Sequence, residues 1–271
     1  MRKERQQSGI QTFGTGRIVF WRGGSLWIGH AVEETGFHAH HAIQTTLALS
    51  GGAVRFQSQG EDWKTYTAAI VAAHHPHAFE ARGELVALIF TEPESRDGRV
   101  LRERCPAGIA AVMPVDCAEE AAALAAAYAQ GKADELLAGC ARAVIEKLTS
   151  IHALPSKPLD PRIERAIDVL REGMGETMTM AAIADAVHLS PERFRHLFLK
   201  ETGIRFRPYV LWLRLEIAVR SYAAGSNLTD AAHAGGFADS AHFSRTFRRM
   251  FGVQAMGVQR ASLLNHRNSR G

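Results

Sequence analysis

The sequence predicts an α+β protein: an N-terminal β-barrel or sandwich, then a pair of helices, then a C-terminal domain made only of helices. Up to about residue 90, short apolar runs are separated by turns that contain glycine, a spacing typical of a small β structure. From about residue 117, apolar side chains recur at steps of three and four, the period of amphipathic helices. With 271 residues, of which 46% are hydrophobic, the chain is long enough to bury two ordinary cores.

The predicted β domain spans residues 1–116. Its candidate strands are rich in branched and aromatic side chains, which pack well on a pleated surface. These candidate strands are residues 17–21, 26–29, 43–49, 53–56, 69–72 and 85–90.

A helical segment is predicted over residues 117–151, with a break at Gly131. Its second half carries one apolar stripe at helical spacing. The stripe consists of Leu136, Leu137, Cys140, Val144, Ile145 and Leu148. We expect this segment to form a dimer interface, and packing of the stripe against the β domain is the alternative.

Residues 152–159 form the predicted linker, because two prolines end the preceding helix and stiffen a short spacer. The predicted C-terminal domain, residues 160–271, begins with a helix that Asp160 can cap and that has Pro161 at its first position. Residues 208–224 are predicted to form one long helix. A rigid helix there would fix the distance between the two motifs on either side of it.

Two helix-turn-helix patterns lie in tandem in this domain. The first comprises residues 180–187 and 191–203, and the second comprises residues 229–237 and 240–252. Each has a short helix, a tight turn and a longer cationic helix, the arrangement that places a recognition helix in the DNA major groove. Two such patterns at suitable spacing predict a DNA-binding domain.

In the first recognition helix, phenylalanines at helical spacing are expected to pack inward, which leaves a polar face outward. Side chains expected to contact base edges are Glu192, Arg195 and His196, and those expected to contact phosphates are Arg193 and Lys200. Arg195 can form a bidentate pair with a guanine edge, and Glu192 can accept from a cytosine amino group. Phosphate contacts would position the helix without reading sequence.

In the second recognition helix, the inward stripe is Phe243, Phe247 and Phe251. The outward side chains expected to contact bases are Ser240, Ala241, Ser244, Arg245 and Arg248, and Arg249 is expected to contact phosphate. Ala241 offers a methyl group for a thymine, and the polar side chains offer hydrogen bonds. The alternative is that these arginines only solvate an amphipathic helix.

Charge and cysteine content agree with a DNA-binding protein of a reducing compartment. From Lys157 onward the chain has 17 Lys and Arg against 11 Asp and Glu, whereas the preceding residues have 15 against 17. The helical half is therefore the basic half, as expected for a surface that faces phosphates. The three cysteines lack a CxxC spacing, and we find neither a signal peptide nor an apolar run of membrane-spanning length. These features predict a soluble cytoplasmic protein without a membrane partner.

The residues 183–190, 194–203, 213–215 and 236–252 resemble the corresponding motifs of the AraC/XylS family of bacterial transcription regulators. The resemblance covers about residues 160–258. It implies that the two recognition helices enter successive major-groove segments on one face of an operator in double-stranded DNA. It also implies an N-terminal cupin-like barrel that senses a small-molecule effector. We further expect a homodimer, and RNA polymerase is a candidate partner.

One departure from the family is the composition of the short helix before the second recognition helix. Ala231, Gly235 and Gly236 stand where the family usually has bulkier aliphatic residues or a single glycine. An internal glycine costs a helix about 1 kcal/mol relative to alanine. We therefore expect this helix to be thin and weakly stable.

The N-terminal half is rich in histidine. Strand alternation would place His38, His40 and Gln44 on one face, and His77 on a neighbouring strand could join them. Three imidazoles match the ligand preference of Zn, Fe or Ni, with a position left open for another ligand. Gln44 stands where cupin enzymes usually have Glu. The alternative is that these histidines line an effector pocket or form structural hydrogen bonds, as we expect of His41.

Three functions follow from these patterns. The leading hypothesis is a sequence-specific DNA-binding transcription factor that responds to a small effector and is not an enzyme. A second is a cupin-type metal-binding protein or enzyme tethered to DNA, and a third is an architectural protein that binds DNA without sequence preference. The second and third predict, respectively, turnover of a small substrate by residues 1–150 and weak discrimination between DNA sequences.

Overall fold

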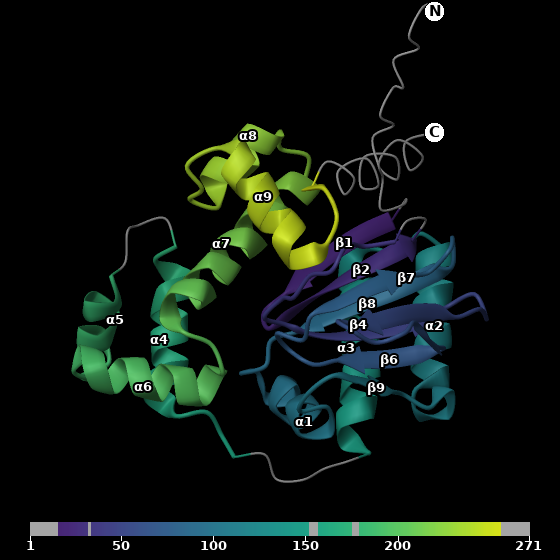
Figure 1. The fold of residues 1–271 in the computed structure, drawn as a ribbon, viewed down its shortest axis with the longest axis horizontal. Coiled ribbons are helices and arrows are strands. Elements are labelled where there is room, and N and C mark those ends of the chain that lie inside the picture. Colours follow the sequence, from purple (N-terminus) through teal and green to yellow (C-terminus); the bar gives the residue numbers. More distant parts are fainter. Residues whose placement is uncertain (1–15, 32–33, 152–156, 175–178, 256–271) are drawn as a thin grey trace, which may run out of the picture.

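The computed structural model describes residues 16–31, 34–151, 157–174 and 179–255. Figure 1 shows a β domain on one side and a helical domain on the other, which confirms the α+β prediction. Most of the predicted linker, residues 152–156, and the ends of the two predicted domains lie outside the described residues.

The β domain consists of two antiparallel sheets. One has the strand order β1-β2-β8-β3-β6-β9 and the other β5-β4-β7. The strands are β1 (Gly16–Trp21), β2 (Gly24–His30), β3 (Ile43–Ala48), β4 (Val54–Ser58), β5 (Lys64–Tyr66), β6 (Ala68–Val71), β7 (His77–Glu80), β8 (Leu85–Thr91) and β9 (Ile109–Ala111). The predicted runs all contain strands, whereas β5, β7 and β9, each of only three or four residues, lie outside them.

Helices cover the outer face of the larger sheet. They are α1 (Arg96–Arg104), the short 3-10 helix η1 (Pro114–Asp116), α2 (Ala118–Ala129) and α3 (Asp134–Ser150). The chain turns between α2 and α3 at Gly131, whose positive φ of 62° suits glycine, so the predicted break is confirmed.

The apolar stripe on α3 packs inside the β domain. Leu137, Val144, Ile145 and Leu148 are buried in one cluster with side chains of the larger sheet. Leu136, in contrast, remains half-exposed. The alternative of packing on the β domain is therefore correct for these four residues, because the sheet would otherwise expose its outer face to water. The stripe no longer supports a dimer interface.

The helical domain contains both predicted helix-turn-helix motifs. Its helices are α4 (Pro161–Glu172), α5 (Met180–Ala186), α6 (Pro191–Thr202), α7 (Phe206–Ala223), α8 (Leu228–Ala234) and α9 (Ser240–Phe251). Asp160 caps α4 as predicted, since its side chain accepts a hydrogen bond from the Arg162 N–H. The long helix α7 joins the two motifs, and α6 and α9 lie near its opposite ends (Figure 1).

The glycines after α8 lie at its end rather than in its interior. Gly235 is the C-cap, and Gly236 adopts a left-handed conformation with φ of 68°. A Cβ atom on Gly235 would lie 2.5 Å from the Arg214 carbonyl oxygen and 2.8 Å from the Ala218 Cβ. The expectation of a weak helix with internal glycines was therefore wrong, because these small residues end α8 and let it pack closely on α7.

The two domains share one apolar core at the end of α9. The Phe251 ring lies 4.7 Å from the Trp27 ring and 5.8 Å from the Phe90 ring, measured between centroids. Phe247 stacks on Trp27 at 6.1 Å. The barrel side of this contact comes from β2 and β8, so the C-terminal end of α9 is docked on the β domain (Figure 1). Among the described residues, we find no helix that has both the length and the apolarity to cross a membrane.

Candidate functional site

The first recognition helix, α6, exposes all the side chains assigned to DNA contact. Phe194 and Phe198 are fully buried, and Gly203 ends the helix in a left-handed conformation. The exposed side chains are Glu192, Arg193, Arg195, His196 and Lys200. Arg195 forms only a surface ion pair with Glu192, at 3.8 Å. Such pairs are worth less than about 1 kcal/mol, so Arg195 is free to reorient toward a base.

The second recognition helix, α9, is amphipathic in the same way. Phe243, Phe247 and Phe251 are buried as predicted, and Asp239 caps the helix by accepting from the His242 N–H at 2.6 Å. The outward side chains are Ala241, Arg245, Arg248 and Arg249, which are exposed, and Ser240 and Ser244, which are half-buried. The assignment of each to bases or phosphates remains a prediction.

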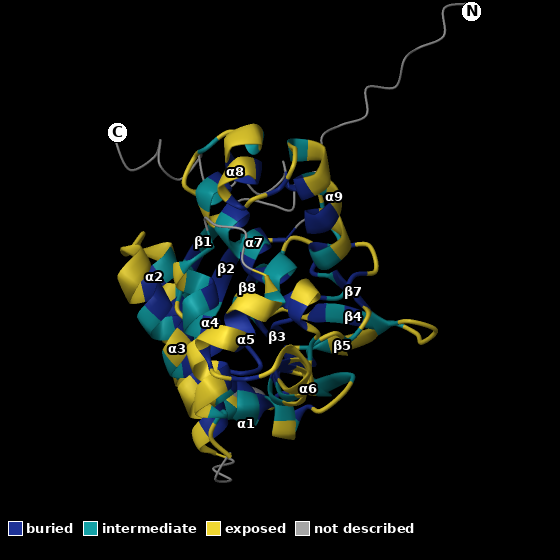
Figure 2. Cartoon of the chain, turned by 90° about the vertical axis from the view of Figure 1, so that its left-hand side faces the viewer, coloured by how far each residue is buried: buried dark blue, intermediate teal, exposed yellow. Residues whose placement is uncertain are grey.

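The two recognition helices do not run parallel in this arrangement. Figure 2 shows α6 nearly along its axis, whereas α9 lies across the view. In Figure 1, α6 and α9 are held apart by α7. Successive major-groove segments on one face of a duplex repeat about every 34 Å with the same orientation. Two helices that insert into them in the same way are nearly parallel, so the arrangement of α6 and α9 in this structure differs from the one that the resemblance implies for DNA binding.

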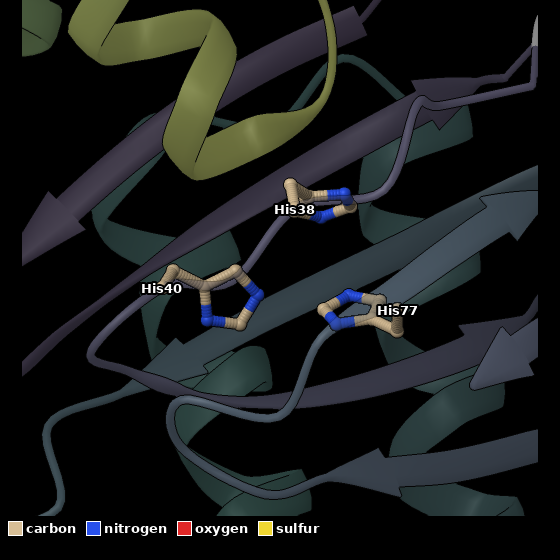
Figure 3. A group of neighbouring side chains, drawn as sticks. All are labelled: His38, His40 and His77. Atoms are coloured by element: carbon tan, nitrogen blue, oxygen red, sulfur yellow. The ribbon is translucent and has the colours of Figure 1, made fainter. Parts of the chain in front are cut away.

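The structure brings all three predicted pocket histidines and Gln44 into one region. The imidazoles of His38, His40 and His77 each place a ring nitrogen within 4.8 Å of the others, and all three side chains are buried (Figure 3). His77 begins β7, whereas His38 and His40 lie on the segment before β3. We expected this segment to be a strand, but its ladder pairing with β7 is limited to an isolated bridge between His38 and His77.

Backbone carbonyls orient the three imidazoles. The Nδ1 atom lies 2.8 Å from the Gly36 oxygen in His38, 2.7 Å from the Ala42 oxygen in His40, and 2.8 Å from the His75 oxygen in His77. A carbonyl oxygen can only accept, so each Nδ1 carries the proton and each Nε2 has a free lone pair. This is how proteins commonly hold histidines that ligate a metal through Nε2.

The Nε2 atoms fit a cation. His77 Nε2 is buried without a hydrogen-bond partner among the described residues, and His40 Nε2 lies 3.0 Å from the Gln44 Oε1. These two acceptors repel each other unless a cation lies between them or the amide is rotated. Three imidazoles and an amide oxygen are a ligand set that suits a divalent transition metal.

Burial keeps these histidines neutral, the form that binds metals. Burial, together with the charge of neighbouring histidines, lowers the pKa of His38 to about 3. Burial likewise lowers the pKa of His40 to about 4 and holds the pKa of His77 well below its ordinary value. Protons therefore compete weakly for the three Nε2 lone pairs near neutral pH.

A small cavity adjoins the histidines and reaches the helical domain. Its volume is about 20 Å³, which is enough for one water molecule. Its lining comprises His38 and Gln44, the apolar side chains Trp27, Phe79, Leu88 and Phe90, and also Thr35, Phe251 and Val253. The last two residues belong to the end of α9 and the segment after it, so the DNA-binding domain forms one wall of the cavity.

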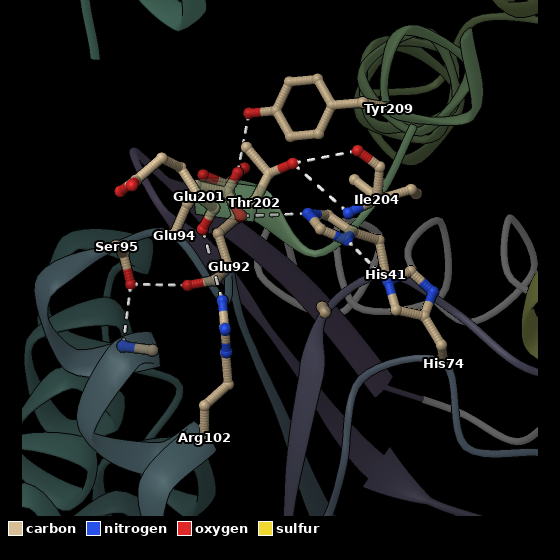
Figure 4. A network of polar contacts seen from close by, with 12 residues as sticks. His41, His74, Glu92, Glu94, Ser95, Arg102, Glu201, Thr202, Ile204 and Tyr209 are labelled. Atoms are coloured by element: carbon tan, nitrogen blue, oxygen red, sulfur yellow. Dashed lines mark hydrogen bonds and ion pairs between the residues drawn. The ribbon is translucent and has the colours of Figure 1, made fainter. Parts of the chain in front are cut away.

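His41 belongs to a separate polar network between the domains (Figure 4). Its Nε2 lies 3.0 Å from the Glu94 Oε2, and the Tyr209 hydroxyl donates to the Glu94 Oε1 at 2.7 Å. Nearby, Arg171 of α4 donates a hydrogen bond to the Glu92 side chain. The structural role expected of His41 is thus confirmed. The sequence did not reveal Glu92, Glu94 or Tyr209, because nothing local marks residues whose partners lie 79 or 115 positions away.

Comparison with known proteins agrees with the geometry of the helical domain. Residues 183–261 match the family described as helix-turn-helix domain. The chain is 37% identical over 84 residues to the uncharacterized HTH-type transcriptional regulator YijO of Escherichia coli strain K12, covering 30% of this chain and 29% of YijO. It is 36% identical over 95 residues to the HTH-type transcriptional activator RhaS of Escherichia fergusonii, covering 34% of each chain. The matches thus span about a third of these relatives.

The fold resembles crystal structures of ToxT from Vibrio cholerae over most of the chain. One has a TM-score of 0.56, with 12% identity and with 89% of this chain and 96% of ToxT covered. Another, of ToxT with a bound unsaturated fatty acid, has a TM-score of 0.53, with 12% identity and with 86% and 92% covered. At this identity the likeness concerns the fold alone.

These findings define the C-terminal part of the chain as a DNA-binding domain of the helix-turn-helix class. More particularly, it has two such motifs joined by α7, as in the AraC type of domain that it resembles. The resemblance that the sequence motifs indicated is therefore confirmed.

Proposed function

We propose that this protein is a sequence-specific DNA-binding transcription factor that responds to a small effector. The observation that supports this most strongly is the pair of capped recognition helices, α6 and α9, each with a buried phenylalanine face and an exposed cationic face. Two such helices on one rigid connector match a DNA-reading domain better than a solvated surface.

Selection of preferred duplexes from a random pool by the full chain tests this proposal. Replacing Arg245 by Ala should weaken binding to the selected duplex by about 1–3 kcal/mol and relax preference at one base pair. Replacing Arg249 should weaken all duplexes about equally and flatten the salt dependence. A pool that stays random after selection would favour the architectural alternative, and equal effects of both replacements would refute the distinction between base and phosphate contacts.

We propose that a divalent metal, Zn, Fe or Ni, is held in the β domain by His38, His40 and His77, with Gln44 beside it. Support comes from the Nε2 lone pairs, of which that of His77 has no protein partner. The metal would supply a buried positive centre able to attract an oxygen ligand. Backbone carbonyls hold the three histidine ligands in place, so the site is rigid before the metal binds.

Elemental mass spectrometry of the untagged protein tests the metal. We expect about one metal ion per chain, lost when His38 and His40 are both replaced by Ala, in line with the loss of two of three ligands. Replacing His75, which pairs with Ser58 outside the cluster, is the matched control and should leave the metal content unchanged. A metal-free protein would leave the histidines as pocket or structural residues.

Further parts of the proposal concern partners. Binding to chromosomal DNA would place the protein in the cytoplasm, and RNA polymerase is a candidate partner of DNA-bound activators. A homodimer is also proposed, for which the half-exposed Leu136 on α3 is the remaining apolar candidate; sedimentation analysis would decide. We propose no enzymatic role, in line with the transcriptional regulators that the helical domain resembles.

A further inference from the structure

The end of α9 is tied directly to the histidine site. The Gly36 N–H donates to the carbonyl oxygen of Gly252, the C-cap of α9, at 3.0 Å. The Gly36 carbonyl in turn accepts from His38 Nδ1. The approach is so close that a Cβ atom on Gly252 would lie 2.4 Å from the Gly36 oxygen and 2.7 Å from His38 Nδ1. Figure 3 shows the last turn of α9 beside the three imidazoles.

The charge of the proposed metal site limits which ligand can occupy the remaining coordination position of the metal. Three neutral imidazoles and one amide leave the two positive charges of a divalent metal uncompensated. The cavity beside the metal ligands is lined by aromatic and aliphatic side chains, and its described lining offers no carboxylate. An unpaired charge in such a pocket is costly. The remaining ligand of the metal should therefore be an anion, and the pocket walls favour one with an apolar body.

The size of the site limits how that ligand can enter. With about 20 Å³, the cavity has room for one water molecule and not for an organic anion. Trp27, Phe79 and Phe90 stand on strands that are hydrogen-bonded within the sheets. Phe251, in contrast, ends a helix and contacts the β domain mainly through its ring. Phe251 is therefore the side chain of the cavity lining that a ligand can displace most readily.

We propose that the effector is a small organic anion, in its simplest form an apolar monocarboxylate, which binds the metal and takes the place of Phe251. Its binding therefore releases the end of α9 from the β domain and lets α9 turn toward the orientation of α6. This inference rests on the proposed metal site and regulator function. It makes effector binding and docking of α9 mutually exclusive, and hence thermodynamically linked.

Calorimetric titration of the full chain loaded with Zn²⁺ tests the ligand class. The probes are benzoate, octanoate and 2-naphthoate, with benzamide as the neutral control of the same shape as benzoate. We expect at least one carboxylate to bind at least tenfold more tightly than benzamide, and to lose that advantage when His38 and His40 are replaced by Ala. Failure of all three carboxylates to bind, or equal binding of benzamide, would overturn the proposal.

Hydrogen exchange tests the displacement. The Gly36 amide, which is bonded to Gly252, should exchange at least tenfold faster in the Zn²⁺-loaded protein when the carboxylate is bound. A ligand that simply filled the closed pocket would slow this exchange instead, and that result would overturn the proposal.

Removing the Phe251 ring tests the proposed displacement independently, through the affinity for the carboxylate. Phe251→Ala should bind the carboxylate at least tenfold more tightly, because the ligand no longer competes with the ring. Met250→Ala, at a neighbouring half-buried position outside the cavity lining, should change affinity less than twofold. Phe251→Leu serves as a second variant if circular dichroism shows that the alanine variant is unfolded. Unchanged or weaker binding in the folded variant would overturn the proposal.

The outcomes of these experiments distinguish this inference from the proposed DNA-binding function and from the proposed metal site. Protein that selects a DNA sequence and takes up Zn²⁺, but binds none of the carboxylates, keeps the proposed function and loses this inference. Protein that takes up no metal loses the metal site and this inference together, whatever its DNA binding shows.

Discussion

The hydroxyl of Tyr209 offers a clean test of how firmly the two domains are joined. Tyr209 lies in the first turn of α7 and is fully buried. Its hydroxyl donates to Glu94 of the β domain at 2.7 Å, and its ring packs edge-on against Phe198 at 5.1 Å. Tyr209→Phe removes the hydrogen bond and keeps the ring, so the packing should survive.

The expected loss of stability in Tyr209→Phe follows from the ionisation state of Glu94, which accepts the hydrogen bond. Burial opposes ionisation of Glu94, but His41 and the hydrogen bonds from His41 and Tyr209 hold its pKa below the ordinary value. The acceptor is therefore a buried carboxylate, and a hydrogen bond to a charged group contributes about 1.5–3 kcal/mol. Tyr209→Phe should lower the free energy of unfolding by that amount, because Glu94 keeps only His41 as a side-chain partner.

The sign of the pH dependence follows from the same shift. A carboxyl group whose pKa is lowered by folding stabilises the protein above its unfolded-state pKa, and that stability is lost as the pH falls through the folded-state pKa. The difference between wild type and Tyr209→Phe should therefore be full near neutral pH and shrink in acid below about pH 4.

Urea unfolding followed by tryptophan fluorescence measures this cost. A double-mutant cycle with Glu94→Ala, which removes the acceptor, isolates the pair, and its coupling energy should be about 1.5–3 kcal/mol. Tyr222→Phe, on the same helix, removes a hydroxyl that has no hydrogen-bond partner among the residues the structure describes, and should cost less than about 0.5 kcal/mol. A coupling energy near zero would refute the view that this hydrogen bond joins the domains.

Two further predictions concern Glu92 at the junction of the two domains and Gly235 between α8 and α7. Burial and the neighbouring charge of Glu94 raise the pKa of Glu92 from 4.5 to about 8, so the stability that its proton provides is complete below pH 4.5 and is lost as the pH rises through about 8. Glu92→Gln should therefore flatten the decline of the urea midpoint over about pH 6 to 9; a parallel decline in both proteins would contradict this. Gly235→Ala should cost about 1–3 kcal/mol, because its methyl group overlaps the Arg214 carbonyl. In the control Gly139→Ala on α3, the methyl group enters open space and should add about 0.5–1 kcal/mol.

The sequence predicted features that local chemistry determines. Asp160 and Pro161 mark a helix start because a side-chain oxygen caps the free N–H groups and proline suits the first position. The phenylalanine stripe of α9 predicts its buried face because helical periodicity needs no knowledge of the partner. The histidine cluster was found for a similar reason, since His38 and His40 lie two residues apart and His77 follows in a second histidine-rich run.

What the sequence could not predict depends on contacts between distant residues. Phe251 was correctly expected to be buried, but burial against α8 or α7 and burial against Trp27 leave the same periodic pattern. Glu92 and Glu94 look like ordinary surface acids before α1, and only the fold places Arg171 and Tyr209 against them. The apolar stripe of α3 likewise predicted a contact without specifying whether a second chain or the sheet would provide it.

The placement of these features on α9 makes its two roles interdependent. The helix has 12 residues and is therefore a rigid rod about 18 Å long. Its exposed face carries the side chains assigned to DNA, and its C-terminal end closes the histidine cavity through Phe251. A rigid rod cannot turn at one end and stay fixed at the other, so α9 cannot align with α6 on DNA while Phe251 and Gly252 stay docked. Under the proposed function, DNA binding therefore opposes closure of the cavity, and by linkage a molecule that opens the cavity favours DNA binding.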